Sequence, residues 1–160
     1  MLDDTIRAMK VLGSNAPASF ESRTVNFNKV YNAPFPVQEG GLPIMFGVKP
    51  SERQAQRIAE LGAGWIPISD KAGYVANGVE KIKEAFVTAG RDLDELEVRA
   101  HVPISFNENG TGNLKNTLES IPEMLEAGAT IIDVEHWPFV TDKDQLPDFY
   151  AQLAETKGQY

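Results

Sequence analysis

Two short stretches of the sequence combine residue types that could do chemistry. Gly47-Val48-Lys49-Pro50-Ser51 joins a predicted strand to a predicted helix. A lysine beside the free N–H groups of a helix start favours an anion such as a phosphate. His136 follows another predicted strand, with Asp133 and Glu135 just before it. Its imidazole is suited to proton transfer, with either carboxylate as an orienting group. We therefore take as candidates Gly47, Val48, Lys49 and Ser51 for cofactor binding and His136 for catalysis.

Each stretch also has a simpler interpretation. Val48 adds a Cβ where a phosphate would need close backbone approach, and Pro50 removes an N–H donor. The loop could therefore be an ordinary strand-to-helix turn, already complemented by Glu52 just inside the helix. Polar residues after a strand are common, so His136 could equally be a surface residue.

Two further residues are expected to serve the structure. His101 lies within a predicted strand, in alternation with Ala100 and Val102, and we expect it to be buried with its hydrogen bonds satisfied. Trp65 is expected to be a core or interface aromatic whose indole N–H finds a partner. Two histidines, no cysteine and no ligand spacing among the carboxylates predict that the chain has no metal site.

Regular elements that could position these residues follow from hydrophobic spacing. A helix is predicted over 1–13, and 14–42 is predicted to be an irregular segment with at most a short hairpin. Beyond it, short apolar runs alternate with amphipathic stripes. A helix break is expected near Ser120 and Pro122. The runs predict four strands, at Pro43–Gly47, Trp65–Ile68, Glu97–Ile104 and Thr130–Glu135, each followed by a helix.

Four successive strand–helix units predict an α/β fold with parallel strands joined by right-handed crossovers. Such a set of units is either a small open sheet or half of an eight-stranded barrel. Hydrophobic spacing alone leaves both possibilities open.

Several motifs in order resemble the luciferase-like family of flavin or deazaflavin (coenzyme F-420) oxidoreductases. They are Val25-Asn26-Phe27, Pro34-x-Pro36-Val37-Gln38, Gly41-x-Pro43-Ile44, Ala59 to Trp65, and Ala89-Gly90-Arg91-Asp92. The resemblance implies a partial TIM-like barrel: the helix of the fourth unit, an inserted irregular segment near the N-terminus (14–42), and strands five to eight. It makes 1–160 a single half-barrel domain, with about four parallel βα units over 43–160.

The same resemblance implies an oxidoreductase or monooxygenase chain that uses FMN or the deazaflavin. In the family, the loop at Gly47 usually has two glycines and helps to bind the cofactor phosphate. Because Val48 replaces the second glycine, and Ala63 stands where relatives usually carry aspartate, cofactor binding could also have been lost. The alternatives are a non-catalytic half-barrel or binding module, and a partial gene product whose first half lies upstream.

Composition limits the partners. A net charge of -8 argues against nucleic acid, which requires clustered lysine and arginine. No apolar run approaches a membrane span, the start does not resemble a signal peptide, and cysteine is absent, so we expect a cytoplasmic protein. Four strands cut from a barrel leave two unpaired edges, which predicts a homodimer or higher homo-oligomer. The small-molecule substrate is not indicated.

Overall fold

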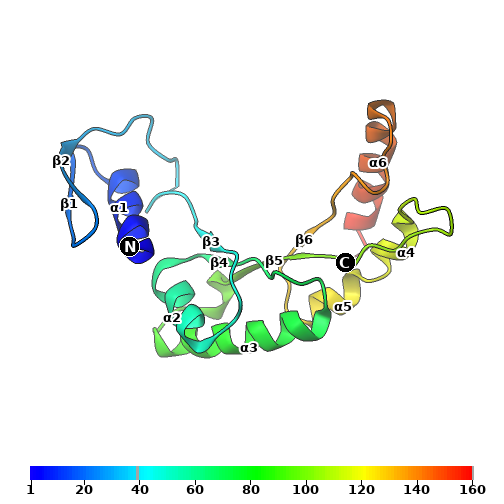
Figure 1. Cartoon of the computed structure of the whole chain (residues 1–160), viewed down its shortest axis with the longest axis horizontal. Coiled ribbons are helices and arrows are strands. Elements are labelled where there is room, and N and C mark those ends of the chain that lie inside the picture. Colours follow the sequence, from blue (N-terminus) through cyan, green and yellow to red (C-terminus); the bar gives the residue numbers. More distant parts are fainter. Residues whose placement is uncertain (39, 160) are drawn as a thin grey trace.

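The strands form one parallel sheet in chain order. The computed structural model describes residues 1–38 and 40–159. Within them the sheet has four strands in the order β3-β4-β5-β6 (Figure 1), so the predicted parallel arrangement is confirmed. The strands are shorter than predicted: β3 (Met45–Phe46), β4 (Gly64–Trp65), β5 (Glu97–His101) and β6 (Ile131–Asp133). A barrel is not closed by these residues.

Helices cover one face of this sheet. Helices α2 (Glu52–Leu61), α3 (Ala72–Thr88) and α5 (Ile121–Glu126) lie beneath it in Figure 1. The predicted break near Ser120 is confirmed, because α4 (Leu114–Leu118) ends just before α5 begins. Two 3-10 turns, η1 (Leu93–Glu95) and η2 (Lys143–Gln145), and the closing helix α6 (Leu146–Lys157) complete this part of the chain.

Trp65 is the largest side chain in the core between sheet and helices. It is 0% exposed, and its Nε1–H donates to the carbonyl of Val48 at 2.8 Å. The expectation of a partnered core aromatic is therefore confirmed. The indole lies against Gly78 of α3 so closely that a Cβ there would come within 2.1 Å of Trp65 Cη2. Ile58, Ile82 and Phe86 pack into the same cluster.

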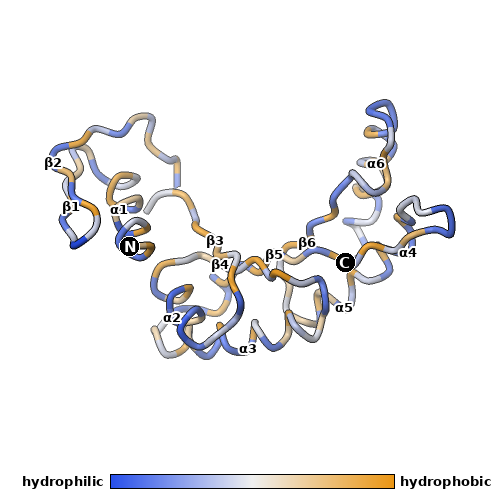
Figure 2. The backbone as a smooth tube through the Cα atoms, viewed as in Figure 1, coloured by the Kyte–Doolittle hydropathy of each residue, from blue (hydrophilic) through white to orange (hydrophobic). Residues whose placement is uncertain are grey.

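The opposite face of the sheet has no covering layer among the residues that the structure describes. Along β5 burial alternates: Val98 and Ala100 are buried against the helices, whereas Glu97 and Arg99 are exposed. This is the pattern of a strand with one packed face and one open face. Figure 2 shows apolar residues at β3, and Figure 1 shows the N-terminal and C-terminal parts rising on either side of the open face.

The segment before the sheet differs from the prediction. The short hairpin is present, because β1 (Ala18–Glu21) pairs antiparallel with β2 (Asn26–Val30). The prediction of an irregular insertion over 14–42 was wrong: the described residues of this range show no insertion, and the hairpin belongs to an ordered unit with α1 (Leu2–Ser14). The Thr24 hydroxyl donates to Asp4 of α1 at 2.7 Å, and this hydrogen bond lowers the pKa of Asp4 below its usual value.

Helix α1 is in turn tied to α2. Arg57 Nε lies 2.6 Å from Asp3 Oδ1, and the hydrogen bond from this guanidinium lowers the pKa of Asp3. Because the folded-state pKa is depressed, this contact stabilises the fold above the unfolded pKa of the carboxyl group. Its contribution is lost as the pH falls through the folded pKa.

Arg91 stabilises the end of α2. It follows Gly90, whose φ of +70° ends α3 in the left-handed region. Its Nη1 donates to the carbonyl oxygens of Ala59 at 3.1 Å and Gly62 at 2.7 Å, and its guanidinium also pairs with Glu95. These carbonyls at a helix C-terminus have no partner within the helix, so a cation there satisfies them and complements the dipole.

We expect Arg91→Ala to lower the free energy of unfolding by about 2 kcal/mol, because it removes charge-assisted hydrogen bonds to partly buried carbonyls. Arg91→Lys should fall between this variant and wild type, since lysine offers one point charge. Exposed Arg53 on α2 is the matched control, and Arg53→Ala should change stability by about 0.5 kcal/mol or less. Urea unfolding followed by circular dichroism measures all three, and equal losses in the two alanine variants would contradict the assignment.

Candidate functional site

A cavity lies where β5 and β6 end. Its volume is about 330 Å³, and its polar and acidic lining comes from His101, Asp133, Glu135 and Asp70, which follows β4. Apolar walls are provided by Phe106 and Phe139, among others. Parallel strands of α/β proteins carry their reactive groups at this carboxyl edge. The cavity is therefore the candidate site of the half-sheet.

Sheet register brings the polar groups together. In the parallel pair, Arg99 lies opposite Ile131 and His101 opposite Asp133. Residues two apart on a strand share a face, so the side chains of Arg99, His101 and Asp133 all extend from the open face. Asp133 Oδ2 accepts from Arg99 Nε at 3.0 Å and lies 2.9 Å from Nη2. His101 Nδ1 is 3.9 Å from the same oxygen.

His101 differs from its predicted role. The expectation of a buried, satisfied histidine was wrong, because its side chain is 41% exposed and lines the cavity. The alternation along β5 placed it on one of two faces, and the sequence did not indicate which face lacks a covering layer. The signal that could have found it is a histidine and an aspartate near the ends of neighbouring strands.

His136 lies in the turn after β6. Its carbonyl accepts from the N–H groups of Phe139 and Val140, at 2.9 and 3.0 Å, and the residue is exposed. The cavity lining includes its neighbour Glu135, whose carboxylate accepts from Trp137 Nε1, but not His136 itself. The structure thus brings Asp133 and Glu135 together at the cavity and leaves His136 outside it.

The loop after β3 lies at the same edge of the sheet. Gly47 has open space around it, since an added Cβ would meet no atom within 4 Å. The other groups are partly engaged: the Val48 carbonyl accepts from Trp65, and the Ser51 N–H donates to Lys49 O at 2.9 Å. Ser51 caps α2, its Oγ accepting from Gln54 N at 3.4 Å.

These contacts test how well the loop fits a phosphate. In favour are the open space at Gly47, the exposed side chain of Lys49 and the start of α2. Against it, the Ser51 N–H is engaged and Pro50 has none. The Pro50 carbonyl also accepts from Lys81 Nζ at 3.4 Å, which ties the loop to α3. The loop therefore fits a phosphate only in part. It offers the Lys49 ammonium group and open backbone at Gly47, but fewer N–H donors than a loop with two glycines.

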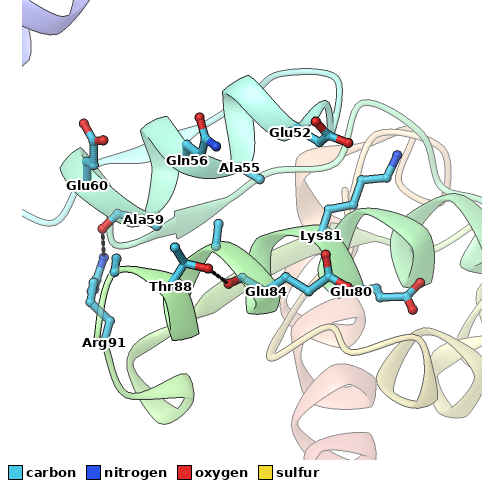
Figure 3. Close-up of a pocket in the computed structure, with 12 residues that line it drawn as sticks. Glu52, Ala55, Gln56, Ala59, Glu60, Glu80, Lys81, Glu84, Thr88 and Arg91 are labelled. Carbon is cyan, nitrogen blue, oxygen red and sulfur yellow. Dashed lines mark hydrogen bonds between the residues drawn. The ribbon is translucent and has the colours of Figure 1, made fainter.

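A larger groove of about 1020 Å³ runs between α2 and α3 (Figure 3). Glu52, Glu80 and Glu84 stand along it, and its cations are both engaged, Lys81 with Pro50 and Arg91 with the end of α2. It lies between helices and away from the ends of β5 and β6, and no histidine lines it. We therefore place the candidate site at the smaller cavity.

Residues 1–38 and 40–159 contain neither a grouped set of metal ligands nor a membrane-spanning helix. No three or more acidic or histidine side chains are grouped there in a way that could hold a metal ion. In the same residues, every helix is too short or too polar to cross a membrane.

Comparison with known proteins extends over nearly the whole chain. The sequence model of a family described as luciferase-like monooxygenase matches residues 1–156. No individually curated protein matches the chain.

Similar solved structures share the fold at low sequence identity. The coenzyme F420 dependent tetrahydromethanopterin reductase from Methanopyrus kandleri aligns with a TM-score of 0.63 and 15% identity, over 82% of this chain and 54% of that one. An F420-dependent secondary alcohol dehydrogenase, in complex with an F420-acetone adduct, aligns with a TM-score of 0.58 and 16% identity. The alignment covers 98% of this chain and 52% of that one. Monooxygenase RslO1 from Streptomyces bottropensis aligns with a TM-score of 0.55 and 17% identity, over 78% of this chain and 39% of that one. The chain thus spans about half, or less, of the length of these structures.

Proposed function

The chain belongs to the luciferase-like monooxygenase family, and on that premise we propose that it supplies one half of an oxidoreductase site served by a flavin or deazaflavin. The observation that carries the proposal is the cavity at the ends of β5 and β6, with His101 and Asp133 in its lining. The F420-dependent enzymes among the similar structures favour the deazaflavin. A second half-barrel would provide the remainder of the site.

The residues of this chain would then have two tasks. Lys49, with the backbone at Gly47 and the start of α2, would hold the cofactor phosphate at the carboxyl edge of the sheet. When bound, the cofactor supplies the hydride or oxygen chemistry. The cavity beside β5 and β6 would hold the substrate and exclude part of the surrounding water, with Phe106 and Phe139 as its apolar walls.

A second candidate is a half-barrel that no longer binds a cofactor. The observation in its favour is that the Ser51 N–H and the Val48 carbonyl are already engaged within the protein. Val48 and Pro50 also each reduce what the loop can offer a phosphate. In that case the chain would act as a binding module.

Titration with FMN and with coenzyme F420 distinguishes the two. We expect binding no tighter than about micromolar, or about -8 kcal/mol, because half of the barrel and several loop donors are missing. Lys49→Ala should weaken it more at low salt than at high salt, since an exposed charge is screened. The exposed Lys143 of η2 is the control, and Lys143→Ala should have no effect.

Fluorescence quenching gives the affinity in each case. Absence of binding by either compound at millimolar concentration would support the cofactor-free module. Binding unaffected by Lys49→Ala would contradict the role of the loop. A tight stoichiometric complex would show that this half suffices for cofactor binding.

A further inference from the structure

We propose that His101 exchanges a proton with the oxygen atom of a small carbonyl or alcohol substrate, and that Asp133 and Arg99 are positioning residues for its imidazole. The inference rests on the proposed oxidoreductase function and deepens it. It assigns the proton-transfer role to a strand residue of the sheet's open face instead of to His136 in the loop.

The positions of the three side chains support this assignment. Arg99 contacts Asp133 Oδ2 through two nitrogen atoms, at 3.0 and 2.9 Å, and so fixes the carboxylate. His101 Nδ1 faces the same oxygen at 3.9 Å. This separation is too long for a hydrogen bond, but contacts of catalytic groups commonly tighten when substrate binds. With Nδ1 toward Asp133, Nε2 is the ring nitrogen left for a ligand.

The cavity itself indicates the class of ligand. A volume of about 330 Å³ is at the lower end of small-molecule sites. Phe106, Phe139 and Ile104 line it with apolar surface, whereas Asp70 and Glu135 add negative charge. Anionic groups are disfavoured beside these carboxylates. A small, mostly apolar compound with one oxygen function, directed at His101, matches both features.

The proton balance of the reduction is simple. When bound, the cofactor would supply the hydride that reduces the carbonyl carbon. The Nε2–H bond of the His101 imidazolium breaks as the O–H bond of the alcohol forms, and the electron pair of the C=O π bond becomes that O–H bond. The neutral imidazole then regains a proton from water, since 41% of its side chain is exposed. Oxidation of an alcohol runs through the same positions in reverse.

The chain offers an internal control for a test. Its histidines are His101 and His136, of which the second is exposed and outside the cavity lining. Nitrogen NMR of the imidazole rings in the cofactor-free full chain distinguishes the proton on Nδ1 from that on Nε2. The measurement is made at a pH where both rings are neutral.

We expect the neutral His101 ring to carry its proton on Nδ1, toward Asp133, so that its two nitrogen signals are well separated. In Asp133→Asn the two signals should move toward each other. Arg99→Gln should cause a smaller shift in the same direction, and Arg99→Lys should restore the wild-type spectrum in part. The His136 signals should stay unchanged in all variants, and amide spectra verify folding.

Titration with cyclohexanol then probes the substrate contact. We expect a saturable shift of His101 Nε2 and none of His136, with the shift reduced in Asp133→Asn. An unchanged His101 spectrum in Asp133→Asn would overturn the positioning role. A cyclohexanol effect on neither ring, or on both equally, would overturn the substrate contact. Because no cofactor is present, these outcomes are independent of the flavin and F420 titrations, and either proposal can fail alone.

Discussion

Trp65→Ala is expected to lower the free energy of unfolding by about 3–5 kcal/mol, the largest loss from any single side chain of this core. Trp65 is fully buried, and no other buried side chain of the described residues is larger. Its removal leaves a cavity between β4 and α3 and frees the Val48 carbonyl that it binds. Small domains have about 5–15 kcal/mol of stability in total. A sheet covered on one face buries less apolar surface than one covered on both, so its total stability is smaller. The variant should therefore be unfolded or nearly so at 37 °C.

Circular dichroism during urea unfolding measures this loss. Trp65→Phe keeps an aromatic ring but loses the N–H donor, so its loss should be smaller. Two glycines of α3 test the same contact from the other side. Gly78→Ala would place a Cβ 2.1 Å from Trp65 Cη2 and should destabilise by about 1–3 kcal/mol. Gly73→Ala meets no atom within 4 Å and should be neutral or stabilising, because alanine favours helix. Equal effects of the two substitutions would contradict the close packing.

Self-association is the second large effect that we expect. The chain should have twice its mass of 17.6 kDa at micromolar concentration. Two features support this proposal. The open face of the sheet has no covering layer, and both edge strands, β3 and β6, lack an outer partner within the described residues. Large apolar side chains are also exposed in the segments that rise beside this face: Tyr31 (74%), Val37 (101%), Leu42 (66%), Phe106 (55%) and Trp137 (62%).

Charge limits how a second copy can sit on this face. Glu97 and Arg99 of β5 and Asp133 of β6 lie on it, and removing charges from water costs several kcal/mol for each ion unless they are well paired. Close contact over these charged residues is therefore less favourable than contact through the apolar segments on either side. A second copy of this chain, bound through those segments, would bury about 2,000 Å² in total and leave the charged residues hydrated.

Sedimentation equilibrium decides the question. Trp137→Glu and Leu42→Glu, made together, should convert the dimer to monomer, because they place charge in the proposed contact. Val87→Glu is the matched control: Val87 is 65% exposed but lies on α3, on the covered side of the sheet. It should leave the mass unchanged. A single species at the chain mass in the unaltered protein would refute the dimer.

Local patterns predicted the elements well and their contacts less well. The continuous apolar run at Ile44, Met45 and Phe46 identified β3. The stripe of Ala55 and Ile58 identified α2, because burial of one helix face imposes a period on the sequence. The strands were predicted too long, since a strand ends where its hydrogen bonds end and apolar residues can continue beyond that point.

The candidate site was harder to predict. The pairing of His101 with Asp133 depends on the register of β5 against β6, and nothing within either strand specifies that register. His136 directly follows a strand in the sequence, but the direction of its side chain depends on the turn that follows, where its carbonyl accepts from two N–H groups. The strands β1 and β2 of the hairpin are short, with Ala18, Phe20, Phe27 and Val30 as their apolar residues, so the periodic signal was short as well.

The order of the sheet has a consequence for folding. Every strand of the sheet pairs with the strand next to it along the chain, and helices contact mainly their neighbours in sequence. Stability is then close to a sum of terms between adjacent units, as in a linear repeat array. Each strand pairing spans one strand–helix–strand unit, so folding can begin at α2, β4 and α3 and spread outward. A substitution that destabilises α6 should therefore lower the stability of the one or two adjacent units and leave that of α1 unchanged.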